Sequence, residues 1–285
     1  MSGEYENSRI ILPTKHCKSR AIAPPFWERL TASVIELELD TDTLGTFSGE
    51  VERQGNAIQC ARRKCEWAFE QLGSEADYCL ASEGSFGPHP VLPFTPCDHE
   101  LLYFIDRKQG FHLHLSSFSE KTNYCTEVVS SLGALEKLAK TALFPSHALI
   151  LRPNRNEKHA PAFKGISSWD SLEEAFHDSQ KHSGDGKVWV ETDMRAHLNP
   201  SRMRVISELA VNFADRLATH CPNCHTPGWG KIGVEKGLRC EYCERPTELV
   251  AYEILGCVSC DHRENHPRTD GVEAAPQMRC RHCNP

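Results

Sequence analysis

The sequence predicts an α/β body on a mixed sheet, followed by a small cysteine-rich domain. Apolar runs alternate with amphipathic segments over residues 1–220, which is typical of α/β proteins. Two of these runs are close enough to form a hairpin, so the sheet must contain antiparallel as well as parallel strands. Eight of the 14 cysteines occur from Cys221 onward. We therefore divide the chain into a body, residues 1–218, and a tail, residues 219–285.

The first strand is expected at residues 9–13, where three aliphatic side chains run together. Apolar and acidic residues alternate over 33–39, which predicts a second strand. Pro24 and Pro25 lie between the two, and we expect them to break any helix there.

A helix is predicted over residues 56–72 because apolar side chains recur at helical spacing and Gly73 supplies a stop signal. The apolar run 78–81 reads as a buried strand that ends in a glycine-rich turn. Residues 101–105 and 111–115 are the strands of the expected hairpin.

The rest of the body continues the alternation. Helices are expected at 132–143 and 169–177, and strands at 147–151 and 188–191. A long helix should begin at Pro200, since proline suits the first turn and the apolar spacing beyond it is helical. This helix is the last element expected in the body.

Composition and charge exclude several classes of protein. Hydrophobic residues at 39% and charged residues at 25% are near globular averages, which excludes wholesale disorder. A net charge of −7 argues against a protein that coats nucleic acid through bulk charge. The N-terminus lacks a secretory apolar core, and no 18 apolar residues run together, so we expect a cytoplasmic protein with no membrane segment.

The tail contains four Cys-x-x-Cys pairs, a spacing that indicates metal binding in a reducing compartment. Two such pairs complete the tetrahedron that zinc prefers, and a closed tetrathiolate site is structural. The expected zinc ligands, for two ions, are Cys221, Cys224, Cys240, Cys243, Cys257, Cys260, Cys280 and Cys283. The gaps of 15 and 19 residues fit two successive zinc ribbons, so sequential pairing is favoured over a crossed scheme, which stays open. The alternative interpretation of these cysteines is that they form disulfide bonds.

Two loops of the body carry charged residues after expected strands. Lys15 and Lys18 follow the first strand and can hold phosphate or another anion, or else are solvated lysines. Asp42 and Glu50 belong to a loop with three carboxylates and two glycines, which resembles a site for a hard cation such as magnesium. The alternative for this loop is a polar turn.

Two further motifs complete the candidate site. Glu83 and Ser85 lie in the glycine-rich segment 81–90, where glycine permits close approach to a ligand. Arg195 and Arg202 flank the start of the last helix of the body, and helix N-termini favour anions. An internal salt bridge from Asp193 to either arginine is the competing explanation.

With DTDTLGTFSGEVER, ASEGSFGPHP, ETDMRAHLNPSRM and the Cys-x-x-Cys tail, the chain resembles a bacterial family known only as a domain of unknown function. Residues 9 to about 90 also resemble inosine/xanthosine triphosphatases in the order strand, lysine turn, Ala-Arg helix and strand ending in Glu-Gly. That resemblance implies a magnesium-dependent hydrolase of nucleotides in which Lys15 or Lys18 holds phosphate and Glu83 serves the metal. The chain departs from that family at Gly55 and Asn56, which occupy the positions where the family has a pair of acidic residues.

The sequence therefore favours a magnesium-dependent hydrolase of a nucleotide or related phosphorylated ligand. Glu83, Asp42 and Glu50 are its expected catalytic residues. Its substrate-binding residues are expected to be Lys15, Lys18, Ser85, Arg195 and Arg202. The alternative is a noncatalytic module whose ribbons dock a protein or nucleic acid; eight basic and nine acidic residues in the tail favour protein contacts over phosphate backbones.

Overall fold

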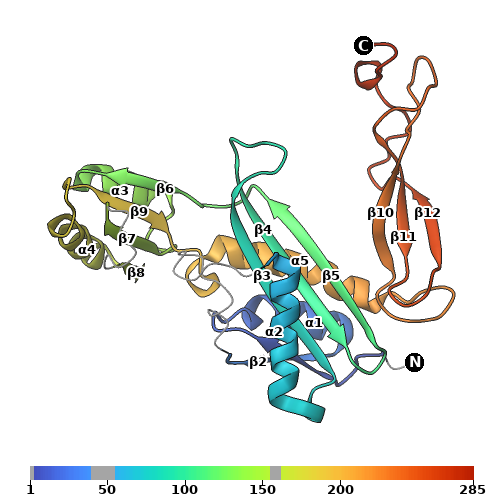
Figure 1. Cartoon of the computed structure of the whole chain (residues 1–285), viewed down its shortest axis with the longest axis horizontal. Coiled ribbons are helices and arrows are strands. Elements are labelled where there is room, and N and C mark those ends of the chain that lie inside the picture. Colours follow the sequence, from blue (N-terminus) through green and yellow to red (C-terminus); the bar gives the residue numbers. More distant parts are fainter. Residues whose placement is uncertain (1–2, 40–54, 155–161) are drawn as a thin grey trace. The chain divides into compact units, whose positions relative to one another are not determined.

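The computed structural model describes residues 3–39, 55–154 and 162–285 (Figure 1). The chain divides into two compact units, Tyr5–Phe213 and a second unit that contains Ala214–Pro285. In the described ranges, no helix combines the length and the apolar character that a membrane crossing requires.

The larger unit is built on a five-stranded sheet in the order β2-β1-β3-β4-β5. Its strands are β1 (Arg9–Pro13), β2 (Ser33–Leu37), β3 (Tyr78–Pro88), β4 (Pro96–Asp106) and β5 (Phe111–Ser119). β1 is parallel to β2 and β3, whereas β3, β4 and β5 are antiparallel. The expected mixed sheet and the expected hairpin are both confirmed.

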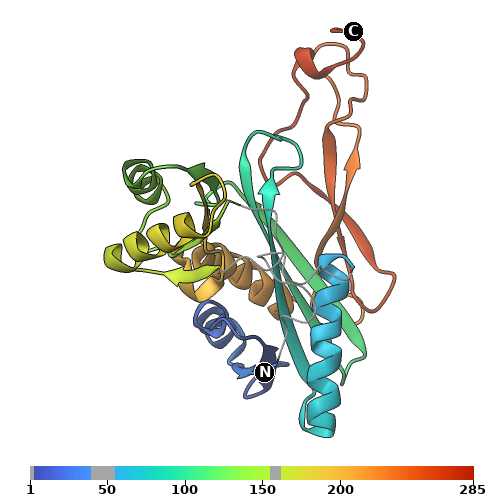
Figure 2. The same ribbon diagram turned by 60° about the vertical axis from the view of Figure 1, so that its left-hand side comes forward.

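Helix α2 (Ala57–Leu72) covers one face of this sheet, where Figures 1 and 2 show it beside β3. The small buried side chains of Ala61, Cys65 and Ala68 pack with Cys79 and others of the sheet, and small residues let a helix approach closely. Asn56 caps the helix through a capping box with Gln59, and Gly73 ends it. The helix predicted over 56–72 is confirmed.

The opposite face is covered by α1 (Ser19–Leu30) and α5 (Pro200–Ala218). Phe213 of α5 contacts the rings of Phe26 and Phe104 at centroid distances of 6.2 and 6.4 Å. The break expected at Pro24 and Pro25 is wrong, because α1 runs through both prolines. Buried Ile22, Phe26 and Leu30 lie four residues apart on one face, and this packing outweighs the lost backbone hydrogen bonds.

The turn expected over residues 81–90 is also wrong. β3 continues through its glycines to Pro88 and pairs with β4 along its whole length, from Tyr78 opposite Asp106 to Pro88 opposite Pro96. Long-range pairing therefore overrides the local preference of glycine for turns. Consequently, Glu83 lies in the middle of a strand.

The larger unit contains a second sheet that the sequence did not predict, in the order β6-β9-β7-β8. Its strands are β6 (Thr126–Val129), β7 (Leu149–Pro153), β8 (Phe163–Ile166) and β9 (Val188–Thr192), and all neighbours are antiparallel. Helices α3 (Leu132–Thr141) and α4 (Trp169–Lys181) bury their apolar faces in one cluster with these strands. Both helices, together with strands β7 and β9, occur where the sequence predicts them.

The C-terminal unit holds a three-stranded antiparallel sheet, β10 (Gly230–Lys236), β11 (Val250–Gly256) and β12 (Arg263–Pro267). Only six hydrophobic residues between 219 and 285 are buried, and three of them are cysteines. These are Cys221, Trp229, Leu238, Cys240, Ala275 and Cys280. Such a small core cannot hold a region of this size together without further support.

Single-turn 3₁₀ helices span Gly73–Glu75, Ala196–Leu198 and Gln277–Arg279.

Candidate metal centres and a buried charged cluster

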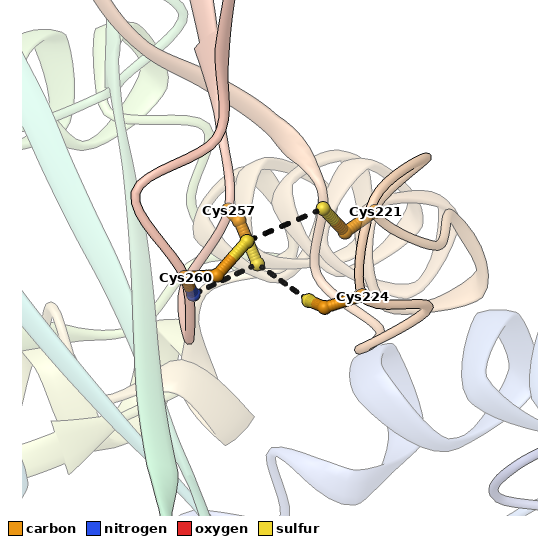
Figure 3. Close-up of side chains that lie close together, drawn as sticks. All are labelled: Cys221, Cys224, Cys257 and Cys260. Carbon is orange, nitrogen blue, oxygen red and sulfur yellow. Dashed lines mark hydrogen bonds between the residues drawn. The ribbon is translucent and has the colours of Figure 1, made fainter.

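The eight tail cysteines form two groups of four. One group joins Cys221 and Cys224 to Cys257 and Cys260, and its side chains converge from two turns in Figure 3. The other group comprises Cys240, Cys243, Cys280 and Cys283. In each group, the sulfur atoms all lie within 4.8 Å of one another.

These groups correct the sequential pairing that we expected. The first Cys-x-x-Cys pair joins the third, and the second joins the fourth. The reason is the length of β10, whose seven residues span about 20 Å. The first and second Cys-x-x-Cys pairs therefore lie at opposite ends of the sheet. Because β11 runs back antiparallel to β10, the third pair lies beside the first, and β12 in the same way leads to the fourth pair beside the second. The 15-residue gap holds one strand, whereas a ribbon hairpin needs two.

The turns that carry the first two pairs have the same backbone geometry. The amide of His225 donates to the carbonyl of Cys221 at 3.0 Å, and that of Glu244 donates to Cys240 at 3.0 Å. His225 and Glu244 adopt positive φ angles of 60° and 57°, which lets each turn close directly after its second cysteine. Each turn thereby aims two sulfur atoms at one point.

The sulfur spacing fits zinc and excludes disulfides. The Sγ atoms of Cys221 and Cys260 are 3.8 Å apart, and those of Cys224 and Cys257 are 3.5 Å apart. A tetrahedron with Zn–S bonds of about 2.3 Å has edges of about 3.8 Å, whereas a disulfide bond measures about 2.05 Å. The two groups can hold structural zinc ions.

The larger unit buries several charged side chains beside the end of β1. Lys18 is 5% exposed, and its Nζ donates to the carbonyl and hydroxyl oxygens of Ser82 at 3.2 and 3.0 Å. Burial lowers the pKa of Lys18 to about 7, with a further contribution from the positive charge of Arg202. The ammonium group is bonded to neutral acceptors and lies near another cation.

His16 is also surrounded by basic side chains. Its ring stacks on that of His197 at a centroid distance of 5.3 Å. Burial lowers the pKa of His16 to about 3, and the charges of Lys18, His197 and Arg202 add to the effect. Imidazole therefore stays neutral here at physiological pH.

Arg202 forms a buried ion pair with a residue that sequence reasoning missed. Its Nε donates to Oε1 of Glu100 at 2.5 Å, both side chains are at most 1% exposed, and its Nη1 donates to the carbonyl of Met194. The guanidinium lies over the ring of Phe86, 5.1 Å from its centroid. Arg202 is thus fixed in a defined orientation.

Asp98 lies two residues before Glu100 on the same face of β4 and is fully buried. Burial and, to a smaller extent, the neighbouring charge of Glu100 raise the pKa of Asp98 to about 8. Ionisation of Asp98 is therefore disfavoured in this position.

Gly84 makes room for the ion pair on this face. A Cβ atom at this position would lie 2.3 Å from Nη2 of Arg202 and 2.6 Å from Oε1 of Glu100. Every residue other than glycine would displace one of these groups. The glycine expected to form a turn is required instead for close approach within the strand.

Glu83 lies on the other face of the sheet, since alternate residues of a strand point to opposite sides. Its carboxylate pairs with Nζ of Lys64 from α2 at 2.6 Å, and both side chains are nearly buried. Ser85 shares this face and contacts Nδ1 of His99 at 3.5 Å. The structure therefore separates Glu83 and Ser85 from Arg202 and places the backbone of β3 between them.

The remaining predicted residues fall in three places. Lys15 is exposed just beyond β1. The guanidinium of Arg195 pairs with Asp193, with 2.6 Å between Nη2 and Oδ2, which is the internal salt bridge that we weighed against a ligand site. Asp42 and Glu50 lie outside the described residues.

Lys64, Asp98 and Glu100 are the charged residues that the sequence analysis overlooked. The signal for the last two was the alternation Asp98, Glu100, Leu102 and Phe104, which places two acids on the same strand face as two core side chains. Acidic residues at core positions of a strand are expensive unless they serve a site.

The family model described as Domain of unknown function (DUF6671) matches residues 64–285. No curated protein matches the chain, and no solved structure does.

Proposed function

The chain belongs to the family described as Domain of unknown function (DUF6671), and we propose that its body is a magnesium-dependent hydrolase of a nucleotide or related phosphorylated ligand. The observation that carries this proposal is the buried cluster of charged side chains around Lys18 and Arg202, to which distant parts of the chain contribute.

A phosphate group suits this cluster because it would offset charges that the fold leaves close together. The hydrogen bonds of Lys18 go to neutral oxygens of Ser82, so a bound anion would add a direct charged partner to the more distant carboxylates of Glu100 and Glu83 that already act on it. Arg202 lies beside it in an ion pair with Glu100, and guanidinium and ammonium groups are the common phosphate ligands of proteins. The resemblance of residues 9 to about 90 to inosine/xanthosine triphosphatases supports a nucleotide as the ligand.

Hydrolysis would proceed by attack of a water oxygen on phosphorus, with cleavage of the P–O bond to the leaving phosphate and loss of a proton from the water. Magnesium, when bound, would neutralise phosphate charge and orient the reacting groups. Lys18 and Arg202 would stabilise the charge that develops on the phosphoryl oxygens, and the buried acids nearby would accept the proton or hold the cation.

The test is release of phosphate or pyrophosphate from a panel of nucleoside triphosphates by the full chain with Mg²⁺. Lys18→Met should lower kcat/KM by on the order of 10²-fold, because it removes one preorganised charge from the transition state. Lys181→Met is the matched control, since Lys181 is exposed and pairs with Asp178 on α4. The proposal fails if no nucleotide is turned over, or if both variants behave alike.

Ligand binding should also depend on pH. The pKa of Lys18 is lowered to about 7 in the free protein, and a bound phosphate would raise it, so binding at pH 8 should take up a proton. Affinity should accordingly fall as the pH rises above 7. Calorimetry in buffers of different ionisation enthalpy measures this uptake, and Lys18→Met should abolish it.

A second candidate function is favoured by side chains exposed in the C-terminal unit. Tyr242 is 75% exposed, Met278 73% and Tyr252 45%, and aromatic residues and methionine are enriched in protein interfaces. This unit would then be a noncatalytic module for a protein partner. Partner capture that survives Lys18→Met but is lost in Tyr242→Ala would support this function; capture unaffected by Tyr242→Ala would count against it.

A further inference from the structure

We propose that Asp98 and Glu100 of β4 form the divalent-cation site of the body, for Mg²⁺ or Mn²⁺. This rests on the proposed phosphohydrolase function and replaces Glu83 with a different pair of carboxylates as the metal ligands. Neither residue was expected to act in the site from the sequence.

Three carboxylate oxygens at this position have no hydrogen-bond donor other than the carboxyl groups of Asp98 and Glu100 themselves. Both Oδ atoms of Asp98 and Oε2 of Glu100 are buried without a partner, and the two side chains are 0% and 1% exposed. A buried carboxylate oxygen that lacks a donor costs on the order of 1–3 kcal/mol. Folded proteins keep such groups rarely, and a ligand that binds them explains their retention.

The nearest cations leave these oxygens available. Arg202 donates its Nε to Oε1 of Glu100, which leaves Oε2 of the same carboxylate open. Lys18 donates to Ser82. Neither of these hydrogen bonds reaches the three open oxygens.

The backbone also keeps space on this face. Gly84 lies directly opposite Glu100 in the β3–β4 ladder, and a Cβ there would approach Oε2 of Glu100 to 2.9 Å. Phe86 lies opposite Asp98 and supports the guanidinium of Arg202. The carboxylates are thus held by a paired strand, which fixes their positions better than a loop does.

Glu83 is less suited to the same task. Its carboxylate pairs with Lys64 at 2.6 Å and lies on the opposite face of the sheet from Asp98, Lys18 and Arg202, so it cannot share a site with them.

The chemistry of the pair selects the metal class. Magnesium takes oxygen ligands, commonly one or two carboxylates together with substrate phosphates and water. Asp98 and Glu100 supply the carboxylates, and the cations Lys18 and Arg202 lie beside them where phosphate charge needs neutralising. Zinc would instead prefer the thiolates of the C-terminal unit.

The experiment measures Mn²⁺ binding to the zinc-loaded full chain by electron paramagnetic resonance, together with nucleotide hydrolysis. Asp98→Asn should weaken Mn²⁺ binding at least about tenfold, since changes even to groups that only support metal ligands cost 10–100-fold. Asp106→Asn is the matched control: Asp106 is a buried carboxylate on the same face of the same strand, but it accepts a hydrogen bond from Tyr5 at 3.1 Å. The Asp106→Asn variant should bind Mn²⁺ as tightly as the unmodified chain does. Thermal unfolding of each variant checks that it is folded.

The outcomes separate this proposal from the proposed function. Mn²⁺ binding that Asp98→Asn weakens, in a chain that turns over no nucleotide, supports the metal site and rejects the hydrolase. Turnover with Mn²⁺ binding unaffected by Asp98→Asn supports the hydrolase and overturns the site. Absence of any Mn²⁺ binding overturns the site in either case and means that the two carboxyl groups share a proton instead.

Discussion

Removal of zinc is expected to unfold residues 219–285 while the sheet of β1 to β5 stays folded. The C-terminal unit buries few apolar side chains beyond its cysteines, so the metal must supply most of its folding free energy. Structural zinc contributes about 10–16 kcal/mol per site in small domains. Hydrogen exchange read by mass spectrometry, before and after chelation, should show protection lost in β10, β11 and β12 and retained in β3 and β4.

Zinc added back to the chelated chain should restore protection at a stoichiometry of two ions per chain. Cadmium, which also binds four thiolates, is a useful second probe. Protection of β10 to β12 that persists after complete removal of metal would mean that the sheet is stable alone, and would contradict a structural role for the eight cysteines.

Glu100→Gln should destabilise the larger unit by about 3–5 kcal/mol. The change leaves the guanidinium of Arg202 buried without a charged partner at Nε, and an uncompensated buried charge is far more costly than the loss of a surface pair. Urea unfolding followed by circular dichroism measures the difference in the free energy of unfolding. The double variant Glu100→Gln with Arg202→Met should recover much of the loss, because it removes both charges.

Glu66→Gln is the matched control for this measurement. Glu66 forms an ion pair with Arg62 at 2.7 Å, but both side chains are exposed on α2 and are four residues apart. Exposed pairs of this kind contribute about 0.3–0.5 kcal/mol. Equal effects of Glu100→Gln and Glu66→Gln would show that the Glu100–Arg202 pair is solvated, against the burial on which the charged cluster depends.

Regular amphipathic elements could be predicted from the sequence because local signals agree with the fold there. The helix that became α2 has a capping residue, helical apolar spacing and a terminal glycine. In β3, by contrast, local and long-range signals conflict, because Gly84 and Gly87 indicate a turn whereas pairing with β4 requires a strand. The four-residue strands β6 and β8 are too short to show a periodic pattern.

In the candidate site, too, the residues marked by local signals could be predicted, whereas those brought together by strand pairing could not. Lys18 and Arg202 stand out beside a strand end and a helix start, positions that the sequence reveals. Asp98 and Glu100 face Arg202 only because β4 aligns with β3 in one register, and Glu83 faces α2 for the same reason. A shift of one residue would exchange these faces, so the sequence alone could not tell which acids belong with which cations.

The crossed joining of the Cys-x-x-Cys pairs is tested most directly by thiol alkylation of Cys221→Ser, read by mass spectrometry on the zinc-loaded chain. Crossed pairing predicts new labelling of Cys224, Cys257 and Cys260, while Cys240 and Cys243 stay protected. The control Cys60→Ser changes a buried thiol outside both groups and should expose none of them. Labelling of Cys240 and Cys243 with protection of Cys257 and Cys260 would contradict the structure and restore two successive ribbons.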